Sequence, residues 1–446
     1  MSNKRTLISE LPKFVGKKVH IRGWLYQFRD LGKIGFAIIR DRTGIAQVVV
    51  EDQALLEQLR GLHPESVLYI DATVQETKYT KTGVELINPA IKIVVKVTEP
   101  APIKFNSPKT NVNLDTAIHH RTLLLRNPKY AFIFKVQGTL LNQFVQAFSK
   151  RDFVHFRPPT LLATPSESGA DVFEVNFFDK QIAYLAQSPQ FYKQIMLIAF
   201  ERVFTITPVF RAEKHDTSRH LLELTQIDGE MAFVDSAMEV MRTAENILLD
   251  VLTAAIDLHK DQFQEFGYDI PTLPKKEIPV LTVKEALKLI EKETGKSAKR
   301  AKLDLDPHDE KVLHNIVKQQ FDSDLVWVYG FHANKNPYTY DDRQDPEVSQ
   351  SYDLLFKGLE ILSGTIRIND YQTLKQNLSN LSSNLDYYHH YLEAMKYGMP
   401  PEGGFSFGLE RLTKQLLGLQ NIKEAVLFPT DLKRIAGQPV QTPKNQ

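Results

Sequence analysis

The stretch "RVFTITPVFRAEKHDTSRHLLELTQIDGEMAF", residues 202–233, places a dense group of charges between two apolar runs. The runs are typical of strands and "HDTS" is a turn signal, so we predict an antiparallel hairpin. Arg211 and Glu213 then project from one face, and the return strand brings Asp228 and Glu230 near it. Such a surface suits a ligand with phosphate and amine groups. A solvated hairpin tip explains the charges equally well, so both interpretations stay open on these residues alone.

The composition limits the class of protein. A chain of 446 residues predicts two or three domains, and a net charge of +1 means that any nucleic acid would be held by local basic patches. The absence of cysteine excludes disulfides, thiolate nucleophiles and Cys-ligated zinc. The N-terminus has no apolar signal core and no stretch approaches the length of a membrane helix. We therefore expect a soluble cytoplasmic protein without membrane contacts.

The N-terminal region differs in texture from the rest of the chain. It contains five short β-branched and aromatic runs, at 18–28, 35–41, 45–52, 66–77 and 87–97. Five short strands favour a small closed barrel of the OB type, and we assign it to residues 1–100. The stretch "TEPAPIKFNSPKTN" is rich in Pro, Ser, Thr and Asn, which predicts a linker, placed at 101–125.

The second domain is predicted to span residues 126–446. Apolar residues recur at helical spacing in 130–152 and 239–258, and strand-like runs are interspersed without a regular βαβ rhythm. This favours an α+β fold, with an antiparallel sheet flanked by helices. The Lys/Glu-rich segment around 260–324 predicts a helical insertion. Its Gly-Lys-Ser is not a P-loop, because Ile290 stands where that pattern needs glycine.

Two further segments carry charges in apolar surroundings. Asp353, Glu360 and Arg367 recur every seven residues in 351–371, where such groups are costly unless they are paired or bind a ligand. Structural ion pairs are the alternative there. In "GMPPEGGFSFGLERLTKQLLGL" the glycines allow a ligand to approach the backbone, and Arg411 lies near the start of a predicted helix.

Three segments in this order resemble motifs 1, 2 and 3 of the class II aminoacyl-tRNA synthetases: "FVHFRPPTLL" with Pro159, "FRAEKHDTSRHLLELTQID" and "GFSFGLERL". Together with the OB-type barrel they resemble the subclass IIb enzymes for aspartate, asparagine and lysine. Within it, the chain is most similar to archaeal-type aspartyl-tRNA synthetases over nearly its whole length. The resemblance implies a ligase that activates L-aspartate with ATP and transfers it to the 3' end of tRNA(Asp).

The resemblance also implies how ATP and Mg²⁺ would be bound. No protein nucleophile is needed, because the carboxylate of aspartate attacks the α-phosphate while positive groups stabilise the phosphates. The implied catalytic residues are Arg211, Arg367 and Arg411. The implied ATP contacts are Arg211, Glu213, His220, Glu360, Gly408 and Arg411. The implied Mg²⁺ ligands are Asp353, Glu360 and Ser363.

For aspartate, the resemblance implies that Lys193 and Arg367 pair with the side-chain carboxylate, while Asp228 and Glu167 hold the α-amino group. The full implied set is Glu167, Ser188, Gln190, Lys193, Asp228, Ser363 and Arg367. The asparaginyl family lacks the lysine, and a buried lysine facing a neutral amide would lose its partner. An asparagine–tRNA ligase and a non-catalytic tRNA-binding paralogue are the alternatives.

Anticodon contacts are implied for Arg29, Phe36 and Gln47, although patterning alone favours Phe36 as a barrel core residue. The resemblance to motif 1 implies a homodimer. Whether tRNA(Asn) is charged as well stays open: Lys81 matches the strict pattern, but Tyr26 matches neither. Leu224 and Asn336 depart from the family pattern, since an adenine-stacking phenylalanine and a basic residue are common at these places.

Overall fold

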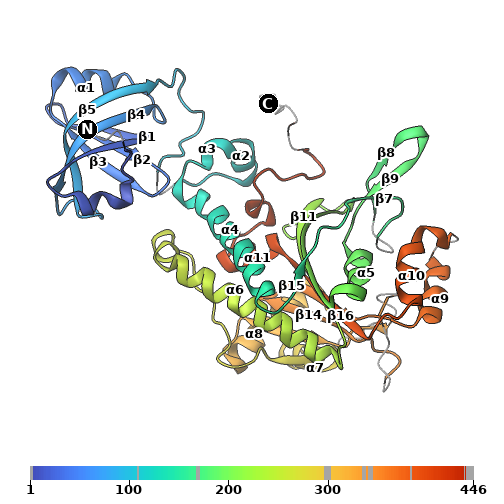
Figure 1. Ribbon diagram of the computed structural model, residues 1–446. Helices are drawn as coiled ribbons and strands as arrows, with labels where there is room; N and C mark the ends of the chain where they lie inside the picture. The colour runs from blue at the N-terminus through green and yellow to red at the C-terminus, as the bar shows by residue number, and fades with distance from the viewer. Residues whose placement is uncertain are drawn as a thin grey trace. The chain divides into compact units, whose positions relative to one another are not determined.

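The computed structural model describes residues 4–107, 110–166, 171–295, 303–333, 338–339, 345–381 and 384–435, together with Gly437. The chain divides into two compact units, Met1–Pro128 and Lys129–Gln446 (Figure 1). Among the described residues, none of the helices combines the length and the apolar character that crossing a membrane requires.

The first unit contains a closed barrel with the strand order β1-β2-β3-β5-β4. The strands are β1 (Lys18–Asp30), β2 (Gly35–Arg40), β3 (Ile45–Val50), β4 (Val67–Glu76) and β5 (Val84–Val95), with α1 (Gln53–Arg60) between β3 and β4. Alternate residues point inward, as Ala37, Ile39, Val48 and Val50 do. The predicted five-stranded OB barrel is confirmed.

The segment between the barrel and the second unit is partly ordered into helices. Phe105 is buried, and α2 (Leu114–His119) and α3 (Arg121–Leu124) follow it. Asn127 donates hydrogen bonds of 2.7 and 3.0 Å to the carbonyls of Phe105 and Ser107. These side-chain hydrogen bonds order a segment that its composition alone predicts only as a linker.

The second unit is built on an eight-stranded sheet with the order β12-β13-β14-β15-β16-β11-β10-β6. In that order the strands are Val280–Thr282, Leu325–Tyr329, Ser351–Phe356, Leu359–Ile366, Glu402–Gly408, Glu223–Ala232, Arg202–Phe210 and Val154–His155. The central pairs are antiparallel, and only the outermost pairs, β12 with β13 and β10 with β6, are parallel. The predicted antiparallel sheet flanked by helices is confirmed. A small sheet of β7 (Leu161–Leu162), β9 (Ile182–Leu185) and β8 (Glu174–Asn176) lies apart from it.

The two faces of the large sheet differ in polarity. Helices α4 (Pro128–Ser149) and α6 (Ala237–Phe266) cover the apolar face, where the Phe148 and Phe204 rings stack with centroids 4.5 Å apart (Figure 1). The other face carries polar side chains. The helices that pack on it are α5 (Gln190–Phe200), α9 (Tyr371–Leu381) and α10 (His389–Lys396) near β10, and α7 (Val283–Thr294) and α8 (Pro307–Phe321) near β13. A pocket on this face is lined in part by residues of β11, β15 and β16.

Residues 260–324, expected as a helical insertion, contain more than helices. The segment begins inside α6, and β12 extends the edge of the sheet by pairing with β13. Val283 of α7 and Leu313 of α8 pack against Val326 and Val328 of β13. The apolar side chains that the charged composition obscures thus join these helices to the sheet.

Candidate active site

The predicted hairpin is present as β10 and β11, joined by a loop over residues 211–222. The Arg211 backbone N–H donates to the Leu222 carbonyl at 2.9 Å, which continues the ladder just beyond the strands. The charged residues after it therefore lie in a loop that begins at a fixed point. Arg211 and Glu213 belong to the loop rather than to the strand that the alternation suggests.

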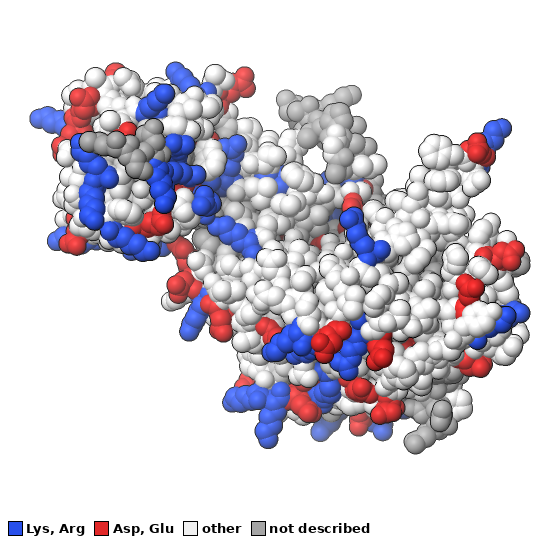
Figure 2. All heavy atoms as spheres, in the orientation of Figure 1, with Lys and Arg blue, Asp and Glu red and all other residues white. Residues whose placement is uncertain are grey.

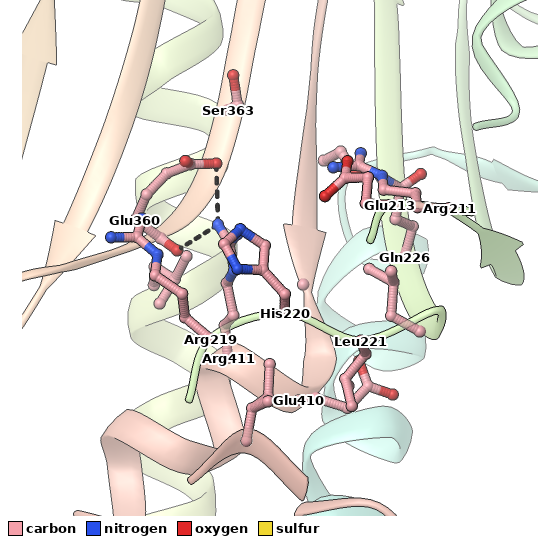
Figure 3. Close-up of a pocket in the computed structure, with 15 residues that line it drawn as sticks. Arg211, Glu213, Arg219, His220, Leu221, Gln226, Glu360, Ser363, Glu410 and Arg411 are labelled. Carbon is pink, nitrogen blue, oxygen red and sulfur yellow. Dashed lines mark hydrogen bonds and ion pairs between the residues drawn. The ribbon is translucent and has the colours of Figure 1, made fainter. Parts of the chain in front are cut away.

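This loop forms one side of a pocket on the polar face of the sheet. Figure 3 shows Arg211 and Glu213 on one side and Glu360 and Arg411 on the other. All six residues proposed to bind ATP line the pocket: Arg211, Glu213, His220, Glu360, Gly408 and Arg411. The structure thus brings together residues from three separate segments of the chain.

Arg411 is positioned by the first turn of α11 (Leu409–Leu417), which follows β16 directly. Its Nη1 donates to the Glu360 carbonyl at 3.1 Å and lies 3.3 Å from the Glu360 carboxylate, as the dashed lines in Figure 3 mark. Both side chains are partly exposed, at 21% and 30%. The pair is open to solvent, so an incoming phosphate can exchange with the carboxylate at modest cost.

His220 lines the same pocket and is close enough to Arg411 to feel its charge. Burial lowers its pKa, and the neighbouring Arg411 lowers it further, so the imidazole is neutral at pH 7. Its Nδ1 lies 2.7 Å from the Thr217 hydroxyl. Arg219, whose role the sequence leaves undefined, pairs through both terminal nitrogens with Glu310 of α8, at 2.9 and 3.1 Å.

A bulge in β15 decides where Glu360 points. Asp353 pairs with Ser363 across the strands, but Leu355 pairs with Glu360, so the register shifts by one residue. Without that shift Glu360 would face away from Ser363, because strand residues three apart point to opposite faces. Glu360 and Ser363 line the pocket, and Asp353 is buried on the same face. These carboxylate and hydroxyl oxygens are of the kind that Mg²⁺ prefers, so the donor set fits such an ion.

A row of paired residues connects the pocket with a second, buried cluster. Across adjacent strands, Asp353 pairs with Ser363, Ser363 with Ser406, and Ser406 with Asp228. The Ser406 hydroxyl donates to Asp228 at 2.7 Å and also lines the pocket. The proposed metal and amino-acid residues therefore share one row on the sheet.

The buried cluster contains two cations and two carboxylates. Lys193 Nζ lies 2.8 Å from Asp228 and 2.9 Å from Glu230, and Arg367 Nε lies 2.8 Å from Glu230. All four residues are at most 5% exposed. Burial alone would raise the pKa of Glu230, but Arg367 and Lys193 outweigh it and lower the pKa. These charges are held in place before any ligand binds.

Helix α5 sets the position of Lys193. The Ser188 hydroxyl accepts from the Gln190 N–H at 3.1 Å at the start of the helix, and the Ser166 hydroxyl accepts from the Gln187 and Ser188 N–H groups. These bonds fix the first turn, which directs the Lys193 side chain inward. Glu167, proposed for the α-amino group, lies outside the described residues.

The comparisons with known proteins agree with this geometry. The sequence model of "tRNA synthetases class II (D, K and N)" matches residues 113–432, and "OB-fold nucleic acid binding domain" matches 19–94. The aspartate–tRNA(Asp/Asn) ligase of Thermus thermophilus is 37% identical over 432 residues, 97% of this chain and 99% of the relative. This chain belongs to the class II aminoacyl-tRNA synthetases.

Other proteins similar to this class II synthetase are aspartyl or asparaginyl enzymes. The aspartate–tRNA(Asp) ligase of Pyrococcus abyssi is 35% identical, over 94% of this chain and 96% of the relative. The solved asparaginyl-tRNA synthetase of Pyrococcus horikoshii with asparaginyl-adenylate has a TM-score of 0.89 at 30% identity, covering 97% of this chain and all of that one. The aspartyl-tRNA synthetase of Entamoeba histolytica has a TM-score of 0.86 at 27% identity, over 97% and 92% of the two chains.

Sequence reasoning missed three residues of the synthetase's buried cluster. The Gln194 amide oxygen accepts from Gln190 at 2.6 Å and from the Tyr391 hydroxyl at 2.9 Å, and its nitrogen donates to Glu402 at 2.6 Å. The alternation of Glu402, Gly404, Ser406 and Gly408 in β16 is a signal that could have revealed Glu402. Gln194 and Tyr391 carry no such signal.

The barrel of this synthetase presents the three proposed anticodon residues on its outer surface. Arg29 pairs with Phe36 across β1 and β2, and Gln47 lies on β3, opposite Ile38. Phe36 is half-buried and lies outside the barrel core, so the core assignment from patterning alone is wrong. Figure 2 shows Lys and Arg side chains spread over the visible face of the barrel.

Tyr26 and Lys81, which the sequence links to the choice between tRNAs, differ in exposure. Tyr26 is buried at a register shift in β1, whereas Lys81 is exposed in the β4–β5 loop. Burial raises the pKa of the Tyr26 phenol. Leu224 lines the pocket, and Asn336 lies outside the described residues.

Proposed function

We propose that this synthetase is an aspartate–tRNA ligase. The observation that carries the proposal is the set of donors left over in the buried cluster. Lys193 donates a hydrogen bond to Asp228 and forms an ion pair with Glu230, and Arg367 pairs with Glu230 through Nε. The third Lys193 donor and the terminal nitrogens of Arg367 have no hydrogen bond to any described residue. They suit a carboxylate side chain, whereas an amide would leave charge unmatched.

The pocket residues would then activate that amino acid. Arg211 would bind the α-phosphate and the attacking carboxylate of aspartate, which forms the aspartyl-adenylate as pyrophosphate leaves. Arg411 would exchange Glu360 for the outer phosphates, and Asp228 would accept from the α-amino group. Mg²⁺ held by Glu360 and Ser363, with Asp353 beside them, would neutralise charge on the phosphates.

The second step would transfer aspartate to the terminal hydroxyl of tRNA(Asp). Arg29, Phe36 and Gln47 would contact the anticodon, since a half-buried aromatic ring on an outer strand face provides a stacking surface. A cytoplasmic homodimer is the assembly that the resemblance to motif 1 favours. The exposed side chains of Val154 and Leu161 in that motif support it.

Charging purified tRNA(Asp) and tRNA(Asn) with labelled aspartate tests the proposal. We expect aspartyl-tRNA(Asp), because both the pocket and the anticodon residues are present. Charging of tRNA(Asp) alone would indicate a strict enzyme, and equal rates on both tRNAs a relaxed one. Failure to charge either tRNA with aspartate would contradict the proposal.

The alternative is an asparagine–tRNA ligase. The TM-score of 0.89 with an asparaginyl-tRNA synthetase supports it. Lys193 argues against it, because its charge would face a neutral amide. Formation of asparaginyl-tRNA, with labelled asparagine and no aspartate product, would establish this alternative.

A further inference from the structure

Glu402 is a buried carboxyl that the proposed mechanism does not use. It lies on β16 with no exposed surface. Its Oε1 accepts from Gln194 Nε2 at 2.6 Å, but its Oε2 has no hydrogen-bond partner among the described residues. An ionised carboxylate with a bare buried oxygen is costly, whereas a neutral carboxyl loses much less.

The hydrogen bonds around Gln194 fix which groups donate. Its amide oxygen accepts from both Gln190 and Tyr391, so its nitrogen must face Glu402. Oε1 of Glu402 is therefore an acceptor, and a proton on this residue would be carried by Oε2.

Glu402 also lies beside a carboxylate that is already ionised. Glu230 pairs with Gly404 in the register, and Ala232 pairs with Glu402, so the two glutamates are diagonal neighbours on one face. A Cβ at position 404 would lie 1.8 Å from the Glu230 carboxylate, so only glycine leaves room for it. Glu230 in turn engages both cations, Lys193 and Arg367.

The groups that face Glu402 come from several elements. They are Glu230 of β11, Lys193 of α5, Tyr391 of α10 and Arg367 beyond β15. Burial raises the pKa of Glu402 to about 8, and Glu230 contributes to the rise, against the opposing effects of Gln194, Arg367 and Lys193. Near neutral pH the cluster then contains two cations and two anions, and bound aspartate would add one charge of each sign through its α-ammonium group and its side-chain carboxylate.

We propose that Glu402 is a specificity-determining positioning residue, whose neutral form keeps the amino-acid pocket in charge balance so that it accepts the side-chain carboxylate of aspartate. Ionisation of Glu402 would add a third negative charge, which repels that carboxylate but not the amide of asparagine. The inference rests on the proposed aspartate-dependent activity. It makes the preference for aspartate over asparagine dependent on pH.

The test measures the KM for aspartate in ATP–pyrophosphate exchange, and the inhibition constant of asparagine against it, from about pH 7 to pH 9. ATP is kept saturating. The KM for aspartate is divided by the inhibition constant of asparagine. This ratio cancels the effect of α-amino titration, because both amino acids carry that group. Because only the neutral fraction of Glu402 would bind aspartate, the ratio should rise about tenfold over this range.

Glu402→Gln should remove this rise, because glutamine holds the neutral form at every pH. The matched control is Glu410→Gln, which removes a different buried carboxyl. Burial raises the pKa of Glu410 to about 7, but it lines the ATP pocket and accepts from the Thr225 N–H. This control should keep the rise in the ratio for aspartate.

A measurement on the unmodified enzyme covers the case in which Glu402→Gln does not fold. Aspartate binding at about pH 8.5 should take up a fraction of a proton, measured by calorimetry in buffers of different ionisation enthalpy. Asparagine should take up less.

The outcomes separate the two proposals. Exchange with aspartate, together with a flat ratio or no proton uptake, overturns the role of Glu402 and leaves the function standing. A rise that persists in Glu402→Gln also overturns it. Absence of aspartate-dependent exchange at every pH overturns the function and this inference together.

Discussion

The open pocket and the buried cluster use the same kinds of residue in opposite ways. In the pocket, Arg411 and Glu360 form a partly exposed pair that a ligand can replace. In the cluster, Lys193, Asp228 and Glu230 are held by short ion pairs away from water. Exposed ion pairs contribute little to the stability of the fold, whereas removing one member of a buried ion pair strongly destabilises the fold. The pocket is thus suited to exchange partners, and the cluster to discriminate between side chains.

The largest expected effect comes from Lys193→Met. It leaves Asp228 and Glu230 with less compensating charge, so we expect the free energy of unfolding to fall by about 3–5 kcal/mol and aspartate-dependent exchange to be lost. Urea unfolding and exchange assays measure the two effects.

Lys423→Met is the matched control, because Lys423 is also buried between two carboxylates, Asp216 and Asp431, at 2.7 Å each. It should lower stability yet keep the preference for aspartate over asparagine. Loss of that preference in the control would break the distinction between the cluster and other buried pairs.

Arg411→Met probes the open pocket. Removing charged hydrogen bonds to phosphate costs about 1.5–3 kcal/mol, so the KM for ATP should rise about ten- to a hundredfold at saturating aspartate. The free energy of unfolding should change by less than about 1 kcal/mol, because the pair with Glu360 is partly exposed. A loss of stability as large as that of Lys193→Met would contradict the comparison.

The pH dependence of stability sharpens the description of the cluster. Since the pKa of Glu402 is raised from 4.5 to about 8, the folded state binds the extra proton in that interval. Its contribution is fully present below about pH 4.5 and is lost as the pH rises toward 8, by at most ~1.4 kcal/mol per pH unit. Denaturant unfolding of the unmodified enzyme should show this fall relative to Glu402→Gln, and parallel curves for the two proteins would refute it.

The smallest effect is expected for Glu310→Gln. This change weakens the bidentate ion pair between Arg219 in the pocket loop and Glu310 in α8. We expect the KM for ATP to change by about two- to fivefold, equivalent to ~1 kcal/mol or less, while the KM for aspartate stays near that of the unmodified enzyme. Steady-state exchange at varied ATP measures it, and an equal change in both constants would show that the loop and the cluster are not separate.

Much of the fold could be predicted because its signals are local. The five barrel strands follow from alternation, and the hairpin at 202–233 from two apolar runs around a turn. The residues proposed to bind ATP in motifs 2 and 3 line one pocket, since each of these motifs fixes its own loop or helix start, while Glu360 joins them from outside the three motifs. Their proposed roles stay predictions.

What could not be predicted depends on contacts between distant segments. The orientation of Glu360 rests on a bulge that is visible only in the register with β14. Gln194 and Glu402 are separated by more than 200 positions but share a hydrogen bond in the interior. The orientation of Phe36 depends on which barrel face each strand residue takes, and the alternating pattern alone assigns it to the core.

The preference for aspartate is the central claim, and the ratio of kcat/KM for aspartate to that for asparagine in ATP–pyrophosphate exchange tests it most directly. The third Lys193 donor and the terminal nitrogens of Arg367, which have no hydrogen bond to any described residue, predict a ratio of roughly a hundred or more at neutral pH. A ratio near one, or a preference for asparagine, would contradict the account.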